Sequence, residues 1–151
     1  MDGPELFRCL RGTYGNVVLH GSPFRFGVVE PRQCLIESED PLHKECGVYG
    51  SQYAPISLLY SIIHENRSNW GWRVDFEKSA EITVTAPNEL KGGVGYLYVL
   101  PKTPFTKDIG DGVCCIAYEP ITPIEVLEVH PTVLEYLQKY FGVLFRTPTA
   151  A

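Results

Sequence analysis

The sequence lacks the features that mark membrane proteins, nucleic-acid-binding proteins and metalloproteins. Its first residues, MDGPELFRCLRG, contain no apolar signal-peptide core, and the longest apolar stretches are far shorter than a membrane span. The formal net charge is −5 and there is no Lys/Arg-rich run, so the charge gives no help in attracting nucleic acid. Five cysteines form no CxxC pair, which argues against a zinc site or a disulfide framework. These absences predict a cytoplasmic protein with no metal and no membrane partner.

Common catalytic signatures are also missing. The chain contains no GxGxxG, P-loop, GxSxG or HExxH motif, no internal repeat and no low-complexity segment. Candidate functional residues therefore have to be found one by one, from their places on the expected strands and helices.

What the sequence does contain is typical of one compact domain built from short segments. Of its 151 residues 44% are hydrophobic, and nine Tyr, seven Phe and two Trp make it rich in aromatic residues. Fourteen Gly and twelve Pro interrupt the chain often, which favours strands over long helices. We expect a single domain over 1–151, with 1–15 as a lead-in and 142–151 as a loose tail.

Periodicity predicts an α+β fold with a mainly antiparallel, split or sandwich-like sheet and two or three short helices. Helices are expected at 55–63 and 132–141, and segment 23–32 is expected to be a turn with a short helix or irregular structure. The longer loops are expected at 33–46, a polar and exposed segment, and at 103–112. Strands are expected at 16–22, 47–50, 73–76, 81–85, 95–100, 113–118 and 124–129.

The stretch from 47 to 63 organises the chain, because a short strand leads directly into a helix. Pro55 suits the first helical turn, and apolar residues follow at helical spacing on a core-facing stripe. Ser57, Tyr60 and His64 lie along one flank of that stripe, next to Tyr49 of the preceding strand. This edge is suited to lining a pocket, although aromatic residues at such positions are also common in cores.

Two further candidates stand far from this unit in the chain. His20 ends a strand and is followed by Gly21, whose backbone groups no side chain obstructs. Glu119 lies between the apolar run CCIAY and Pro120, so it is either at a sheet edge or in a partly desolvated cleft. Each of these residues also has an ordinary structural interpretation.

Together these residues resemble the ADP-ribosyltransferase superfamily, in its branch with a His-Tyr-Glu triad that includes diphtheria toxin and the poly(ADP-ribose) polymerases. In that branch a strand ends in His-Gly-Ser, a second strand carries a Tyr, and the next helix adds a Ser eight residues later and a Tyr three residues beyond. A Glu before the last strands completes the triad. The matching residues here are Leu19-His20-Gly21-Ser22, Gly47-Val48-Tyr49, Ser57, Tyr60 and Ala117-Tyr118-Glu119.

The resemblance implies an enzyme that cleaves the nicotinamide–ribose bond of NAD and transfers one ADP-ribose unit to a protein or nucleic-acid acceptor. NAD would be the substrate, and no metal would be needed. Tyr49 and Tyr60 would stack on nicotinamide, Gly21 and Ser57 would bind its carboxamide, and His20, beside Ser22, would bind a ribose hydroxyl. Glu119 would stabilise the cationic sugar.

Departures from the family pattern leave several alternatives open. Pro120 is awkward in a central strand, so Glu125 and Glu128 are alternative acids. Ala117 stands where relatives that modify arginine or guanine have a second acidic or amide residue, which disfavours those acceptors. A non-catalytic NAD or ADP-ribose binding module, an NAD glycohydrolase and a plain interaction domain remain alternatives. An RNA 2′-phosphotransferase is disfavoured by the scarcity of basic residues near the motifs.

Two other motifs have both a functional and a structural interpretation. Arg32 would suit the pyrophosphate of NAD, because a guanidinium matches phosphate geometry, or it would form a surface ion pair. The Trp70-Gly71-Trp72 run is either a ligand or partner patch, or a turn pinned by two aromatic rings.

Overall fold

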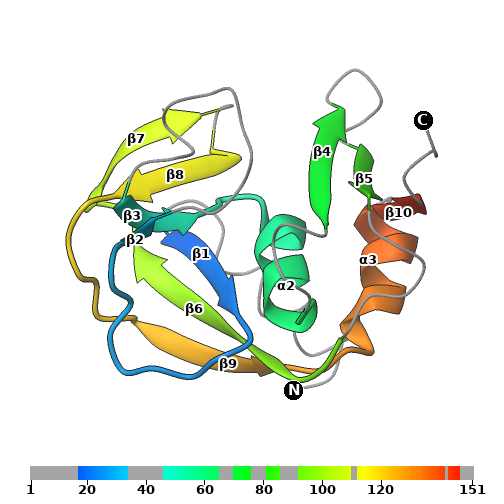
Figure 1. The fold of residues 1–151 in the computed structure, drawn as a ribbon, viewed down its shortest axis with the longest axis horizontal. Coiled ribbons are helices and arrows are strands. Elements are labelled where there is room, and N and C mark those ends of the chain that lie inside the picture. Colours follow the sequence, from blue (N-terminus) through cyan, green and yellow to red (C-terminus); the bar gives the residue numbers. More distant parts are fainter. Residues whose placement is uncertain are drawn as a thin grey trace.

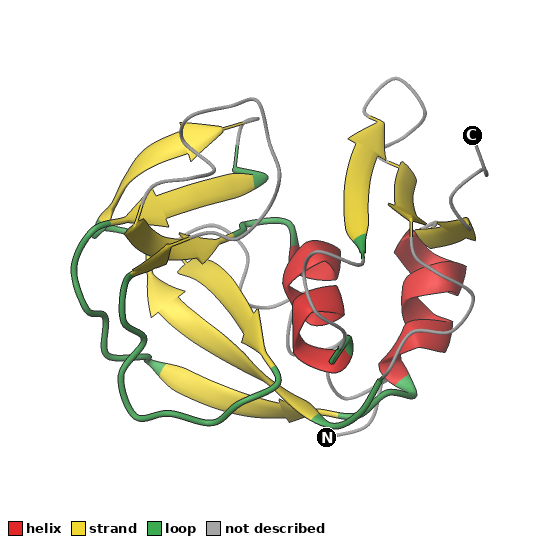
Figure 2. Cartoon of the chain, viewed as in Figure 1, coloured by secondary structure: helices red, strands yellow, loops and turns green. Residues whose placement is uncertain are grey.

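A computed structural model describes residues 17–33, 46–64, 70–75, 81–85, 92–109, 112–141 and 143–146. Within these ranges the chain forms three sheets and two helices, and all strand pairs but one are antiparallel (Figures 1 and 2). The prediction of an α+β protein with mainly antiparallel sheets is therefore confirmed.

The strands belong to sheets of three, four and three strands. The first sheet has the order β1 (Val17–Ser22), β6 (Gly95–Pro101) and β9 (Glu125–Val129). The second has the order β2 (Arg32–Gln33), β3 (Cys46–Gly50), β8 (Cys114–Ala117) and β7 (Phe105–Ile109). The third has the order β10 (Val143–Arg146), β5 (Glu81–Thr85) and β4 (Gly71–Asp75).

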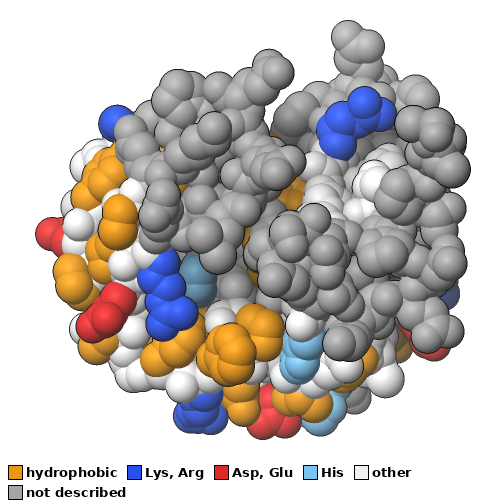
Figure 3. All heavy atoms as spheres, viewed as in Figure 1, with side chains coloured by type: hydrophobic (Ala, Val, Ile, Leu, Met, Phe, Trp, Pro, Cys, Tyr) orange, Lys and Arg blue, Asp and Glu red, His pale blue; other side chains and the backbone are white. Residues whose placement is uncertain are grey.

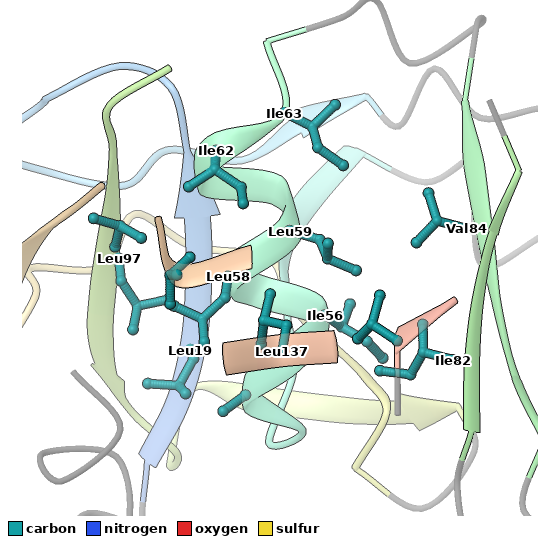
Figure 4. Close-up of a cluster of buried hydrophobic side chains, with 14 of the residues drawn as sticks. Leu19, Ile56, Leu58, Leu59, Ile62, Ile63, Ile82, Val84, Leu97 and Leu137 are labelled. Carbon is teal, nitrogen blue, oxygen red and sulfur yellow. The ribbon is translucent and has the colours of Figure 1, made fainter. Parts of the chain in front are cut away.

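Helix α2 (Ala54–Ile62) lies at the centre of the fold (Figure 1). On one side of it is the first sheet, with β1 and β6, and on the other side are the third sheet and helix α3 (Val133–Phe141). Pro55 lies in the first turn of α2, as expected. Its apolar side chains meet those of both groups in one core, in which Figure 4 shows Leu19 and Leu97 on one side and Ile82 and Val84 on the other. A helix surrounded in this way is apolar on nearly all sides rather than on one stripe.

Helix α2 packs unusually close to the first sheet. A Cβ built on Gly21 of β1 would lie 1.8 Å from the backbone oxygen of Ser57, and one built on Gly95 of β6 would lie 1.6 Å from that of Ser61. Only glycine allows backbone to approach backbone at this separation. The two neighbouring strands therefore hold the helix in a fixed position.

The opposite face of the first sheet carries a second, smaller core around Tyr98. This tyrosine is fully buried, and its hydroxyl donates to the carbonyl of Phe24 at 2.6 Å and accepts from the N–H of Phe26 at 2.9 Å. The Phe26 ring also stacks on Tyr98, with centroids 5.0 Å apart. Tyr98 thus anchors the segment that follows β1, which forms bends and a bridge from Val29 to Ile121.

Several predicted boundaries were wrong. The predicted loop at 103–112 contains β7, whose exposed residues Thr106, Lys107 and Asp108 suit an edge strand paired with β8. Part of the predicted tail, Val143–Arg146, forms β10, which pairs in parallel with β5. The segment 23–31 forms bends and one bridge, which agrees with the irregular alternative rather than with a short helix. The lead-in 1–15 and most of the polar loop 33–46 lie outside the described residues.

Candidate functional site

The candidate site lies where β1 and β3 separate. Leu19 and Ser51 form one antiparallel bridge, with both N–H···O distances at 2.8 Å. On either side of the separation β1 then pairs with β6, and β3 pairs with β2 and β8. This arrangement agrees with the split sheet expected from the sequence. It leaves the backbone of residues 20–22 and 48–50 diverging from a common point.

His20 crosses this separation. Its Nδ1 lies 2.6 Å from the carbonyl oxygen of Tyr49. Because a carbonyl can only accept, Nδ1 carries the hydrogen and Nε2 carries the lone pair. The imidazole is therefore held in one tautomer and one orientation, with Nε2 as the ring atom able to accept a hydrogen bond from a ligand hydroxyl.

The surroundings of His20 keep it neutral. Desolvation by burial lowers the pKa of His20 from its ordinary value of 6.5, the bond to the Tyr49 carbonyl partly raises it, and the charge of Arg32 lowers it again. Tyr98 contacts the ring at a centroid separation of 5.8 Å. Arg32 is thus close enough to act on His20 electrostatically, while its guanidinium lies 5.4 Å from the centre of the Phe26 ring.

Ser57 and Gly21 join His20 and Tyr49 at this point. The Ser57 hydroxyl is buried and donates to the carbonyl of Leu19 at 2.7 Å, while the close approach of Gly21 sets β1 directly against the helix backbone. Ser22 is also buried, and its hydroxyl accepts from the N–H of Phe24 at 3.1 Å, which starts the turn after β1. The structure therefore brings four predicted residues together and gives the fifth, Ser22, a role in the turn.

Tyr60 lies on the next turn of α2, toward the third sheet. Its hydroxyl accepts from Trp72 Nε1 at 2.9 Å, and its ring lies 5.2 Å from that of Trp70 at a tilt of 58°. Trp70 is buried and Trp72 lies within β4, so the prediction of a turn at this run was wrong. His64 is exposed, and it follows the end of α2, so it does not continue the row of Ser57 and Tyr60 as the sequence suggested.

Glu119 occupies a different position from the one that the sequence suggested. Strand β8 ends at Ala117, and Glu119 follows in a bend with an exposed side chain. Tyr49 pairs with Ile116, so Glu119 lies three residues beyond that pair, outside the strand. The β8 residues whose alternation places them on the face of Tyr49 are Ile116 and Cys114, neither of them acidic. Pro120 accounts for the early end of the strand.

The two alternative acids lie in the first sheet, two strands away from β1. Glu125 and Glu128 are exposed residues of β9, which β6 separates from β1. Two strand spacings amount to about 9.6 Å. Glu128 also contacts Nε2 of His130 at 3.0 Å. Neither carboxylate adjoins His20.

Other features of the described residues bear on ligands. None of their His, Cys, Asp and Glu side chains form a group of three or more that could hold a metal ion. Their Lys and Arg side chains are scattered over the face drawn in Figure 3 rather than gathered in one patch. Neither α2 nor α3 has the length and apolar character that a membrane crossing requires. No family model, curated protein or solved structure matches this chain.

Proposed function

We propose that this chain is an NAD-dependent mono-ADP-ribosyltransferase that binds NAD where β1 and β3 separate. The observation that carries the proposal is the 2.6 Å contact between His20 Nδ1 and the carbonyl of Tyr49, residues 29 positions apart in the sequence. It joins two of the motifs on which the resemblance rests, and it orients a neutral imidazole to accept from a sugar hydroxyl.

The remaining binding roles follow from this arrangement. The aromatic rings of Tyr49 and Tyr60 are half-buried and offer flat surfaces for a nicotinamide ring. The Ser57 hydroxyl already donates to Leu19 and so retains lone pairs that accept from a carboxamide N–H. Arg32 lies on the side of His20 and supplies a guanidinium for the pyrophosphate.

The transfer reaction breaks the bond between the anomeric carbon and the nicotinamide nitrogen, and nicotinamide leaves as a neutral molecule with the bonding electrons. The acceptor nucleophile then bonds to the anomeric carbon and loses its proton. Positive charge develops on the sugar between these events, so a carboxylate nearby stabilises the transition state. Glu119 is the proposed carboxylate.

Non-catalytic binding of NAD or ADP-ribose is the second candidate, and the position of Glu119 favours it. Glu119 is exposed in the bend after β8, and the β8 residues on the face of Tyr49, Ile116 and Cys114, are not acidic. The same residues would then bind the ligand without cleaving it.

Nicotinamide release from labelled NAD, measured with and without cell lysate as a source of acceptors, separates these functions. Glu119→Gln tests the acid, and Glu30→Gln is a matched control because Glu30 is also exposed and also precedes a proline. For the transferase we expect release and labelling of lysate macromolecules, lost in Glu119→Gln but retained in Glu30→Gln. Release without labelling would indicate a glycohydrolase.

Thermal stabilisation by NAD completes the test. A ligand at a hundred times its Kd stabilises the folded state by about 2.7 kcal/mol. Stabilisation without nicotinamide release would indicate the binding module, and unchanged turnover in Glu119→Gln would reject the role of that residue. Neither stabilisation nor release in the wild-type protein would reject NAD as the ligand.

A further inference from the structure

Tyr60 is the one residue of α2 that is not fully buried. Every other position from Ala54 to Ile62 is buried, so Tyr60 is the partly exposed aromatic ring that the helix can offer to a ligand. Its ring and its hydroxyl are each held by a tryptophan from the run Trp70-Gly71-Trp72, for which neither the proposed reaction nor the binding site has yet given a role.

The two tryptophans hold Tyr60 in complementary ways. The indole Nε1–H of Trp72 can only donate, so the Tyr60 oxygen is its acceptor at 2.9 Å. Trp70 meets the ring at a tilt, a geometry that aromatic pairs prefer. Because Trp70 is only 5% exposed and packs in the α2 core, it forms a rigid wall. The Trp70 contact fixes the plane of the phenol ring, and the Trp72 hydrogen bond fixes the position of its hydroxyl.

The hydrogen bond also ties two parts of the fold together. Trp72 lies in β4, opposite Val84 of β5, whereas Tyr60 belongs to α2. Strand β4 rises beside α2 in Figure 1, so the indole reaches from the third sheet to the helix. Both Trp72 and Tyr60 are half-buried, so part of each side chain remains exposed beside their hydrogen bond.

We propose that Trp72 is a positioning residue for Tyr60, and that the unit of Tyr60, Trp70 and Trp72 holds the planar nicotinamide ring of NAD. The inference rests on the proposed NAD site and adds to it a residue that sets ligand specificity. A ligand ring that stacks on Tyr60 binds more tightly when the phenol is already oriented, because no binding free energy is then spent on ordering that side chain. ADP-ribose lacks the nicotinamide ring and gains nothing from this unit.

The test compares the Kd values of NAD and ADP-ribose in the full chain by calorimetry. Trp72→Phe keeps an aromatic ring but removes the donor, and Tyr60→Phe removes the acceptor from the other side. Tyr136→Phe, at a half-buried tyrosine of α3, is the matched control. The readout is the preference for NAD over ADP-ribose, since a general loss of structure would weaken both ligands together.

We expect both test variants to lose about fivefold of that preference, the ratio that one ordinary hydrogen bond provides, while Tyr136→Phe keeps it. The two tryptophans of the chain both contact Tyr60, so NAD should also change the intrinsic fluorescence of the wild-type protein. If Trp72→Phe does not fold, Tyr60→Phe decides the matter alone.

If the folded variants kept the wild-type preference for NAD over ADP-ribose, the positioning role of Trp72 would be overturned, but the proposed NAD site would not. If both ligands bound more weakly by the same factor, the tryptophan would have a purely structural role, and its proposed positioning role would also be overturned. If the wild-type protein binds neither ligand, the proposed NAD site fails, and this inference fails with it. That outcome is seen before any variant is made.

Discussion

Gly95→Ala is expected to destabilise the protein strongly, because it forces α2 away from the first sheet. An alanine Cβ at this position would lie 1.6 Å from the backbone oxygen of Ser61 and 2.4 Å from its carbonyl carbon. The obstacle is backbone, which cannot rotate away as a flexible side chain would. The helix and β6 must therefore separate by at least about 1.4 Å before the methyl group fits.

The magnitude follows from what such a shift opens. Leu58, Leu59 and Ile62 are buried on the same helix, and their contacts with the sheets loosen together. Inserting one methyl group into a close-packed core costs about 1–3 kcal/mol, and an obstacle made of backbone places this site at the upper end, about 3 kcal/mol. For a chain of this length that corresponds to a fall in Tm of about 6–12 °C.

Gly71→Ala is the matched control for this measurement. Gly71 and Gly95 are each the first residue of a strand, but a Cβ on Gly71 would meet no heavy atom of the described residues within 4 Å. Its effect should remain within about 0.5 kcal/mol. Thermal and urea unfolding of both variants provide the measurement. Equal Tm values and equal free energies of unfolding for Gly95→Ala and Gly71→Ala would refute the close packing of α2 on β6.

Three further predictions concern residues around the site. Tyr98→Phe should cost about 1–3 kcal/mol in urea unfolding, because two backbone groups of segment 23–31 lose their partner; an unchanged midpoint would contradict the anchoring role. Since burial lowers the pKa of His20, the unfolded chain binds the proton more readily, and stability should be complete above the unfolded pKa and fall as pH drops below it. Between about pH 7.5 and about pH 5.5 the Tm should therefore fall more in the wild type than in His20→Gln, and an equal fall in both would refute the lowered pKa of His20. Burial raises the pKa of Cys115 to about 11, so a thiol reagent at about pH 8 should label exposed Cys46 well before Cys115, as peptide mapping by mass spectrometry would show.

Local patterns predicted the central unit well. Strand 47–50 and helix 55–63 were expected from a short apolar run, a proline and a helical spacing of apolar residues, and β3 and α2 lie there. Each of these signals lies within a few residues of the element that it predicts. The meeting of His20 with Tyr49, 29 positions apart, was instead implied by the resemblance to the ADP-ribosyltransferases.

The wrong predictions share a physical cause, since each depended on a partner distant in sequence. Strand β7 is polar and is stabilised by its hairpin with β8, while β10 forms because β5 offers a free edge. The place of Glu119 depends on where β8 ends relative to Tyr49, and residue spacing alone does not encode that register. Trp72 likewise gains its role only through Tyr60 on another element.

Titration of the isotope-labelled protein with NAD, followed by the backbone amide signals, tests the central assignment most directly. We expect saturable shifts grouped at Gly21, Tyr49, Ser57 and Tyr60, which three elements, β1, β3 and α2, contribute around the region where β1 and β3 part. Saturable shifts confined to β9 and α3, or no shifts at all with NAD in large excess, would contradict the account.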